Sequence, residues 1–259
     1  PIAAALCLGI VNDTSENVDA DFLFPSLTRF GASPPIKKSR LKKLISESYP
    51  LFTPKKGVIA SIDGGMGELI EELQTQISSL SNVTIILGKE ADSIQSVSEY
   101  YDVPLTSVLW TGPNPDYEQG YSEISVFAVG YTNKQVEHIE VGYGTLIPDK
   151  EVPISGILHE SDVHQSKRSP EGHRLFRLMV PKRRWKGDED SVRTSAEHLL
   201  AKDPVMFEKI GERRIPSYMP GHLSKMGQIK PEWSHAGWYY SGVSITHVAD
   251  QAERIAELF

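Results

Sequence analysis

The sequence lacks several features that would each indicate a class of protein. It has one cysteine, Cys7, among 259 residues, so no disulfide can form within the chain. That favours a reducing compartment, and we interpret Cys7 as a small buried hydrophobic residue. The formal net charge is −7, so the basic excess typical of a nucleic-acid binder is missing. No apolar run reaches the ~20 residues that span a bilayer, and no secretory signal opens the printed sequence.

Motifs for phosphate binding, acyl transfer and zinc binding are also missing. The sequence has no Gly-x-Gly-x-x-Gly, no P-loop and no Gly-x-Ser-x-Gly. The segment HESDVHQSKRSPEGH, residues 159–173, is rich in metal-ligating side chains. However, His159 and His164 are five residues apart, whereas two zinc ligands on one helix face are four apart. We therefore interpret the segment as a polar loop beside a strand, without a metal site.

What the sequence does contain is ordinary globular composition, 39% hydrophobic and 24% charged, with a βαβ pattern at residues 57–88. This stretch, GVIASIDGGMGELIEELQTQISSLSNVTIILG, predicts a strand, a glycine turn, a helix and a second strand. Apolar residues fall on one face of the helix, at Leu69, Ile70, Leu73, Ile77 and Leu80. The glycines Gly64, Gly65 and Gly67 fit either a phosphate cradle or close strand-to-helix packing, and their spacing favours packing.

The middle of the chain is rich in strand signals. SVLW (107–110), EISVFAVGYT (123–132), VEHIEVGYGTLIP (136–148), ISGILHE (154–160) and HRLFRLMVP (173–181) predict a mixed or antiparallel sheet. A helix is predicted over residues 189–203. Within the third segment, Gly142 and Gly144 flank Tyr143, a pattern that fits either close approach of a ligand or a simple bulge.

The last 23 residues, GWYYSGVSITHVADQAERIAELF, predict an apolar strand, a turn at Gly242 and a helix over residues 246–259. The helix has one apolar stripe, formed by Val248, Ala249, Ala252, Ile255, Ala256 and Phe259. Free N–H groups in its first turn would favour an anion or a polarised carbonyl. The alternative is simple packing of a terminal strand and helix.

Taken together and in this order, six segments resemble the oxygen-dependent protoporphyrinogen oxidases, flavoproteins of the FAD-dependent amine-oxidase superfamily. The segments extend over nearly the whole chain: LCLGIVNDTSENVDADFLFPSL, SIDGGMGELIEEL, VEHIEVGYGTLIP, FRLMVP, IPSYMPGHL and WYYSGVSITHVADQAERIAELF.

The resemblance implies an α/β with α+β architecture, an FAD-binding amine-oxidase-type fold with a mixed-sheet substrate domain, represented in part. Residues 1–50 would be the end of a helical, membrane-associated or substrate region, and residues 51–103 a βαβ segment of the FAD domain. Residues 104–215 would form the mixed-sheet substrate domain. Residues 216–259 would return to the FAD domain with a closing strand and helix.

The resemblance also implies a cofactor, FAD, and a tetrapyrrole substrate. Tyr143, Gly144 and Leu146 would lie at the tetrapyrrole cavity, with Met179 facing them across the isoalloxazine. Against the flavin would lie Gly242, Val243 and Ser244. The backbone of Ala91 would approach the adenine side.

The implied reaction is oxidation of protoporphyrinogen IX to protoporphyrin IX in haem biosynthesis, with O2 as acceptor. Such an oxidase would associate peripherally with a membrane: the inner face of the cell membrane in a bacterium, the mitochondrial inner membrane in a eukaryote. A homodimer is compatible with the resemblance. Alternatives are another FAD amine-oxidase or desaturase-type oxidoreductase, or a non-catalytic porphyrin-binding module.

Three departures from the family pattern bear on whether this chain alone can bind FAD and act as an oxidase. The Gly-x-Gly-x-x-Gly turn that would bind the FAD diphosphate is missing, Tyr143 stands where Phe is usual, and His247 stands where an acidic residue is usual. We therefore expect the isolated chain to bind little or no FAD and to show no turnover.

Overall fold

The structure, a computed structural model, describes residues 2–25, 28, 37, 39–40, 43, 62–113, 120–164, 168–231 and 234–258. The chain divides into two compact units, one of residues 1–16, 61–73 and 121–217, the other of residues 17–60, 74–120 and 218–259. Each unit therefore combines segments that are far apart in the sequence. The first predicted strand of the βαβ pattern, at residues 57–61, lies outside the described residues.

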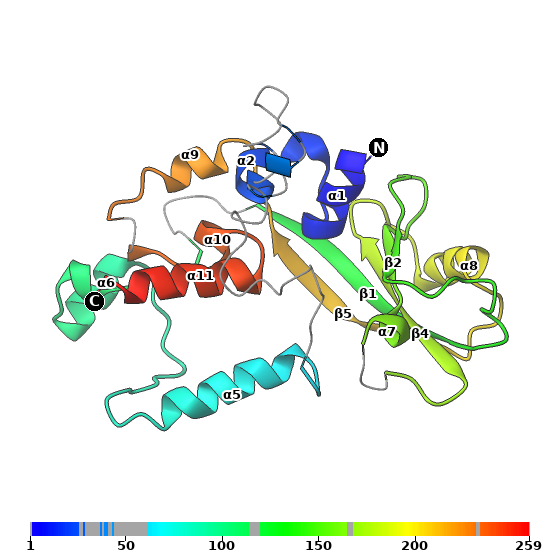
Figure 1. The fold of residues 1–259 in the computed structure, drawn as a ribbon, viewed down its shortest axis with the longest axis horizontal. Helices are drawn as coiled ribbons and strands as arrows, with labels where there is room; N and C mark the ends of the chain where they lie inside the picture. Colours follow the sequence, from blue (N-terminus) through cyan, green and yellow to red (C-terminus); the bar gives the residue numbers. More distant parts are fainter. Residues whose placement is uncertain are drawn as a thin grey trace. The chain divides into compact units, whose positions relative to one another are not determined.

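The first unit is built on a five-stranded antiparallel sheet in the order β2-β3-β4-β1-β5 (Figure 1). The strands are β1 (Tyr121–Thr132), β2 (Gly144–Leu146), β3 (Gly156–Leu158), β4 (His173–Pro181) and β5 (Met206–Pro216). The predicted antiparallel sheet is thus confirmed. The long strand β1 pairs along most of its length with β4 on one side and β5 on the other.

One face of this sheet carries the hydrophobic core. Phe127 is paired with Leu178, and Val129 with Phe176, so these side chains share a face. The helix predicted at 189–203 is formed as α8 (Glu189–Leu199), and its Val192 and Ala196 pack into the same cluster. The side chain of Asp188 caps α8 by accepting the N–H of Ser191 at 3.0 Å.

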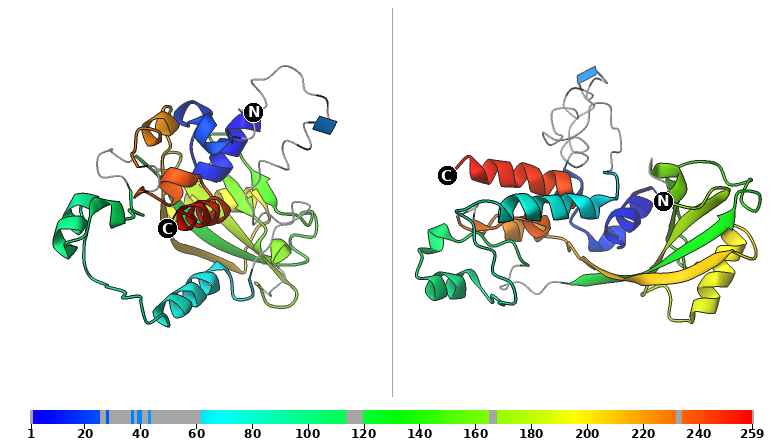
Figure 2. Two further views of the ribbon diagram at one scale, coloured as in Figure 1. Left: turned by 60° about the vertical axis from the view of Figure 1, so that its left-hand side comes forward. Right: turned by 90° about the horizontal axis from the view of Figure 1, so that it is seen from below.

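The opposite face of the sheet is partly covered by α1 (Ile2–Val11), which lies on the other side of the strands from α8 (Figure 2). Gly9 of α1 comes so close to the Leu146 side chain that an added Cβ would lie 3.0 Å from it. Asn12 then fixes the end of α1 to β1, since its amide donates to the Ser122 hydroxyl at 2.7 Å. Cys7 is buried, as predicted.

The regular secondary structure described in the second unit is mainly helical. Its helices are α2 (Ala20–Leu23), α6 (Ile94–Tyr101), α9 (His222–Met226), α10 (Trp238–Ser241) and α11 (Ile245–Ala256). Rings of Phe22, Tyr218 and Tyr239 surround the imidazole of His222 at centroid distances of 4.5 to 5.1 Å. Burial lowers the pKa of His222, and its Nε2 donates to the Tyr239 carbonyl at 2.8 Å.

Several predicted elements differ in the structure. The helix after the glycine turn is confirmed as α5 (Met66–Ser78), but it buries none of its residues. Residues 82–88, predicted as a strand, form no regular structure and are exposed. A lone strand cannot pair its backbone groups, and no described strand lies beside this one. The predicted strand at 107–110 is a 3-10 turn, Leu105–Ser107, followed by one parallel bridge from Trp110 to His235.

Two further corrections concern the sheet and the end of the chain. Residues 136–142, predicted as strand, form turns, so only Gly144–Leu146 of that segment pairs in the sheet. The predicted closing strand is instead the short helix α10. Strand β5 was not predicted, because its apolar residues are few and are interspersed with Glu, Lys and Arg.

Asp19 joins two distant parts of the second unit. One carboxylate oxygen accepts the N–H groups of Asp21 and Phe22 at 3.1 Å, and the other accepts that of Leu223 at 3.0 Å. The Asp19 N–H also donates to the Tyr218 carbonyl at 2.6 Å. A single buried carboxylate thus caps α2 and the start of α9, the first turns of two helices about two hundred residues apart.

We expect Asp19→Ala to lower the free energy of unfolding by about 1–3 kcal/mol, because it leaves buried N–H groups of two helices without an acceptor. Urea denaturation followed by tryptophan fluorescence measures the change. The matched control is Asp21→Ala, since Asp21 is exposed in the first turn of α2 and should cost less than about 1 kcal/mol. Equal losses in the two variants would contradict the double-capping role.

Candidate functional site

The structure brings together two of the four predicted substrate residues. Leu146 is paired with Gly156 on one side, and Met179 is paired with the same Gly156 on the other. Directly opposed residues of neighbouring strands share a face, so Leu146 and Met179 flank a glycine on the face opposite the core. This row of directly opposed residues continues across the sheet, because Met179 is paired with Val126 on β1 and Val126 with Gly211 on β5. The space beside Gly156 is taken by the Leu146 side chain and that beside Gly211 by the Arg213 guanidinium, which would lie 3.4 Å and 3.0 Å from an added Cβ.

Tyr143 and Gly144 lie at the beginning of β2. Tyr143 is 56% exposed, and its carbonyl accepts the N–H of His159 at 3.0 Å. Gly144 has a φ of 155°, and a Cβ there would overlap the carbonyl oxygen of Ile157 on β3. The glycine is therefore required by the pairing of β2 with β3. Gly142, by contrast, has nothing within 4 Å of an added Cβ.

The polar segment after β3 is engaged in ion pairs. It forms α7 (Glu160–Val163), in which Asp162 pairs with Arg174 at 2.6 Å. Glu160 pairs with Arg177 at 2.9 Å and with Nε2 of His164 at 3.1 Å. Within the described part of the chain there is no group of three His, Cys, Asp or Glu side chains arranged to hold a metal. The carboxylates here neutralise arginines of the neighbouring strand β4.

The predicted flavin residues Gly242, Val243 and Ser244 form the turn between α10 and α11. Gly242 is buried with a φ of 119°, and an added Cβ would lie 3.1 Å from the His247 ring. The Ser244 hydroxyl accepts the N–H of His247 at 3.0 Å and so caps α11. Ala91 is exposed in the irregular segment before α6. These residues belong to the second unit, whereas the predicted substrate residues belong to the first.

The described residues do not fit the diphosphate of FAD. At the glycine turn before α5, the Glu68 carboxylate folds back so far that a Cβ on Gly64 would lie 2.7 Å from its oxygen. A carboxylate at a helix N-terminus satisfies the positive end of the helix dipole and repels phosphate. At α11, the Ser244 hydroxyl already satisfies one first-turn N–H. The turn at 242–244 has the small residues that contact with a ring edge requires, but no group that would hold a diphosphate.

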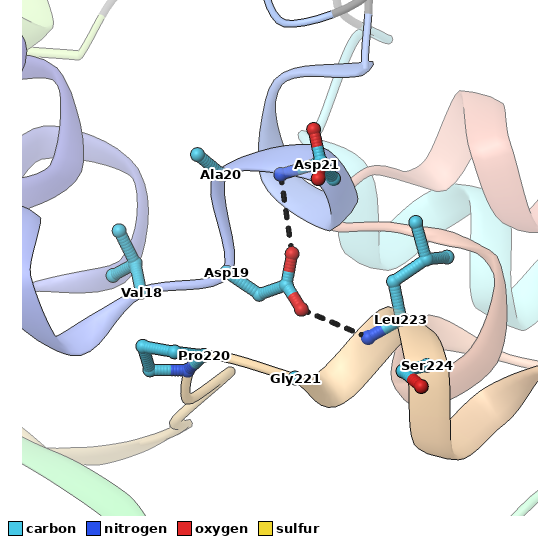
Figure 3. A pocket seen from close by; sticks show the side chains of 8 residues that line it. All are labelled: Val18, Asp19, Ala20, Asp21, Pro220, Gly221, Leu223 and Ser224. Atoms are coloured by element: carbon cyan, nitrogen blue, oxygen red, sulfur yellow. Dashed lines mark hydrogen bonds between the residues drawn. The ribbon is translucent and has the colours of Figure 1, made fainter.

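A cavity of about 450 Å³ in the second unit has an acidic wall. Figure 3 shows its lining residues, Val18, Asp19, Ala20, Asp21, Pro220, Gly221, Leu223 and Ser224. The dashed lines in the figure show that the Asp19 carboxylate is occupied by backbone N–H groups. Neither Lys nor Arg lines the cavity, so it does not suit an anionic ligand. Asp19 was not among the residues predicted from the sequence, although an Asp followed by an apolar helical turn is a recognisable capping signal.

Comparison with known proteins supports the fold. No family model and no curated protein matches the sequence. Among solved structures, the crystal structure of a "putative protoporphyrinogen oxidase" from Exiguobacterium sp. 255-15 matches with a TM-score of 0.56 and 16% identity. The match covers 98% of this chain and 62% of that one. Reduced UDP-galactopyranose mutase matches 54% of this chain and 34% of its own, with a TM-score of 0.43 and 16% identity.

The predicted fold class is therefore confirmed. The chain has a mixed α/β architecture with a five-stranded antiparallel sheet, and its fold is similar to that of part of the oxidase structure that it matches. At 16% identity the likeness concerns the fold alone. The chain spans less than two thirds of the length of the oxidase structure that it matches.

We expect Gly144→Ala to destabilise the first unit by about 1–3 kcal/mol, because the new methyl group would displace the Ile157 carbonyl from the β2–β3 pairing. The matched control is Gly142→Ala, which meets open space and should change the free energy of unfolding by less than about 0.5 kcal/mol. Thermal unfolding by circular dichroism compares them. A tolerated Gly144→Ala would show that the close backbone approach is not required.

Proposed function

We propose that this chain is part of an FAD-dependent oxidoreductase that converts protoporphyrinogen IX to protoporphyrin IX with O2 as acceptor. The observation that carries the proposal is the row Leu146, Gly156 and Met179, within a fold that matches 98% of the chain. Thioether and aliphatic side chains beside a glycine offer an apolar floor, which suits a flat macrocycle.

The chain's own contribution to this chemistry would be to bind and orient the substrate. Oxidation of a large apolar ring to an aromatic one depends on its position against a hydride acceptor more than on a side-chain acid or base. That agrees with the absence of a nucleophile or catalytic dyad motif in the sequence. The sheet face would also exclude water from one side of the ring.

Peripheral association with a membrane, the inner face of the cell membrane or the mitochondrial inner membrane, belongs to the same proposal. Among the described residues, the helices are all too short or too polar to cross a bilayer.

The isolated 259 residues are expected to carry little or no FAD after purification, because neither the glycine turn before α5 nor the start of α11 provides for a diphosphate. Absorbance at about 450 nm, where oxidised flavin absorbs, measures the FAD content of the purified protein. The control is the same protein incubated with excess FAD and passed through gel filtration. Near-stoichiometric flavin after that step would contradict the predicted lack of a diphosphate site.

The full product of the gene that encodes this chain is expected to oxidise protoporphyrinogen, with one peroxide formed for each electron pair transferred to O2. Porphyrin fluorescence and a peroxide assay follow the two products. Met179→Ala should lower kcat/KM by about tenfold, because it removes apolar contact on the proposed substrate face. The exposed Met219 of the second unit is the control position.

Two outcomes would favour the other candidates. Oxidation of a polyene or an amine, with protoporphyrinogen left unchanged, would point to another flavin oxidoreductase. Porphyrin binding without flavin or turnover would point to a non-catalytic binding module.

A further inference from the structure

His222 links three segments of the second unit that are far apart in the sequence. The residue is 5% exposed, and its ring makes edge-to-face contacts with Phe22 of α2, with Tyr218 before α9 and with Tyr239 of α10. Phe22 and Tyr218 also stack on each other, with ring centroids 5.0 Å apart. The imidazole is therefore the centre of a small aromatic cluster that joins α2, α9 and α10.

The hydrogen bond of His222 shows which ring nitrogen carries the proton. Nε2 lies 2.8 Å from the carbonyl oxygen of Tyr239, and a carbonyl oxygen can only accept. Nε2 therefore carries the proton, and Nδ1 is the nitrogen that would take up a second one. The neutral ring thus holds α10 to α9 by a hydrogen bond as well as by ring packing.

The groups around the ring do not suit an imidazolium ion. Burial is the main reason that the pKa of His222 is lowered, and the charge of Lys225 on α9 lowers it further. Asp19 at the start of α2 acts in the opposite direction, but its two oxygens already accept N–H groups from α2 and α9. Tyr239 faces the ring from α10, and burial raises the pKa of Tyr218 to about 12, so that Tyr218 is neutral. A proton added to His222 would therefore be a buried charge without a carboxylate to receive it.

We propose that His222 is a pH-sensitive latch, which holds α2 and α10 against α9 when its ring is neutral and releases them when the ring is protonated. Below the ordinary histidine pKa of about 6.5, the opened segments take up a proton that the closed cluster resists. The closed state is therefore favoured above that pH and loses stability as the pH falls. Because α10 ends at Ser241, its release is expected to reach the turn at 242–244. This inference does not depend on the proposed oxidase activity.

Hydrogen exchange of the 259-residue chain, followed by mass spectrometry between about pH 7.5 and about pH 5, measures the opening of each helix. Each rate is divided by the intrinsic exchange rate at the same pH, so that the ratio reports opening alone. Peptides that cover α2 and α10 should open severalfold more often as the pH falls below about 6.5. Peptides that cover α8 in the first unit are the internal reference and should change less.

Variants assign the pH response to His222. His222→Gln keeps an N–H donor for the Tyr239 carbonyl but has no group that titrates in this range, so α2 and α10 should open equally often at both ends of it. The matched control is His235→Gln, because the His235 ring also contacts α10, with its centroid 5.0 Å from that of Tyr240. This control should keep the pH response. Circular dichroism shows whether each variant is folded.

A titration of the histidine ring protons by NMR tests the latch directly on the unmodified chain. The His222 signal, assigned by its loss in a folded variant, should titrate below the ordinary histidine pKa. Titration at or above that value would overturn the inference, as would an unchanged pH response in His222→Gln or an equal rise in the opening of α8. If His222→Gln does not fold, His222→Phe replaces it, since a phenyl ring keeps the aromatic packing and does not titrate.

Discussion

The pairing of β1 with β4 and β5 is the constraint on which the candidate site depends. Because side chains alternate along a strand, this register places Phe127 and Leu178 in the core and Val126 and Met179 on the opposite face. A shift by one residue would exchange the two faces, and would expose the aromatic core to solvent. The hydrophobic cluster beneath α8 therefore fixes the register, and the register fixes the face on which the proposed ligand would lie.

The two faces of the sheet differ in the size of their side chains. Large aromatic and branched residues fill the core face, where Phe127, Phe176 and Val129 have no exposed surface. The other face has Gly156 and Gly211 in its central row, with Arg177 held by the buried Glu160 in the next. This face is partly covered by α1, and Val126 and Gly156 in its central row are buried. Leu146 and Met179 keep exposed surface, and these are the side chains that the proposed function uses.

The second unit shows how glycines and helix starts that resemble ligand sites can serve the protein itself. Gly242 makes room for the His247 ring, Ser244 caps α11, and Glu68 lies against Gly64 at the glycine turn before α5. At Asp19, one carboxylate accepts N–H groups from α2 and from the start of α9. Helix ends are satisfied here by the chain's own side chains, and that limits what they offer to a diphosphate.

The sequence by itself determined the elements whose signals are local. Helical periodicity predicted α5, α8 and α11, and alternating or apolar runs predicted β1, β3 and β4, because propensity and amphipathic pattern act over a few residues. It could not show that residues 82–88 would find no partner strand, that the charged stretch 206–216 would pair with β1, or that Gly144 meets the Ile157 carbonyl. Only the tertiary structure decided these points and placed Arg177 beside Met179 with Glu160 behind it. Strand pairing and burial of charge depend on contacts between segments that lie far apart in the chain.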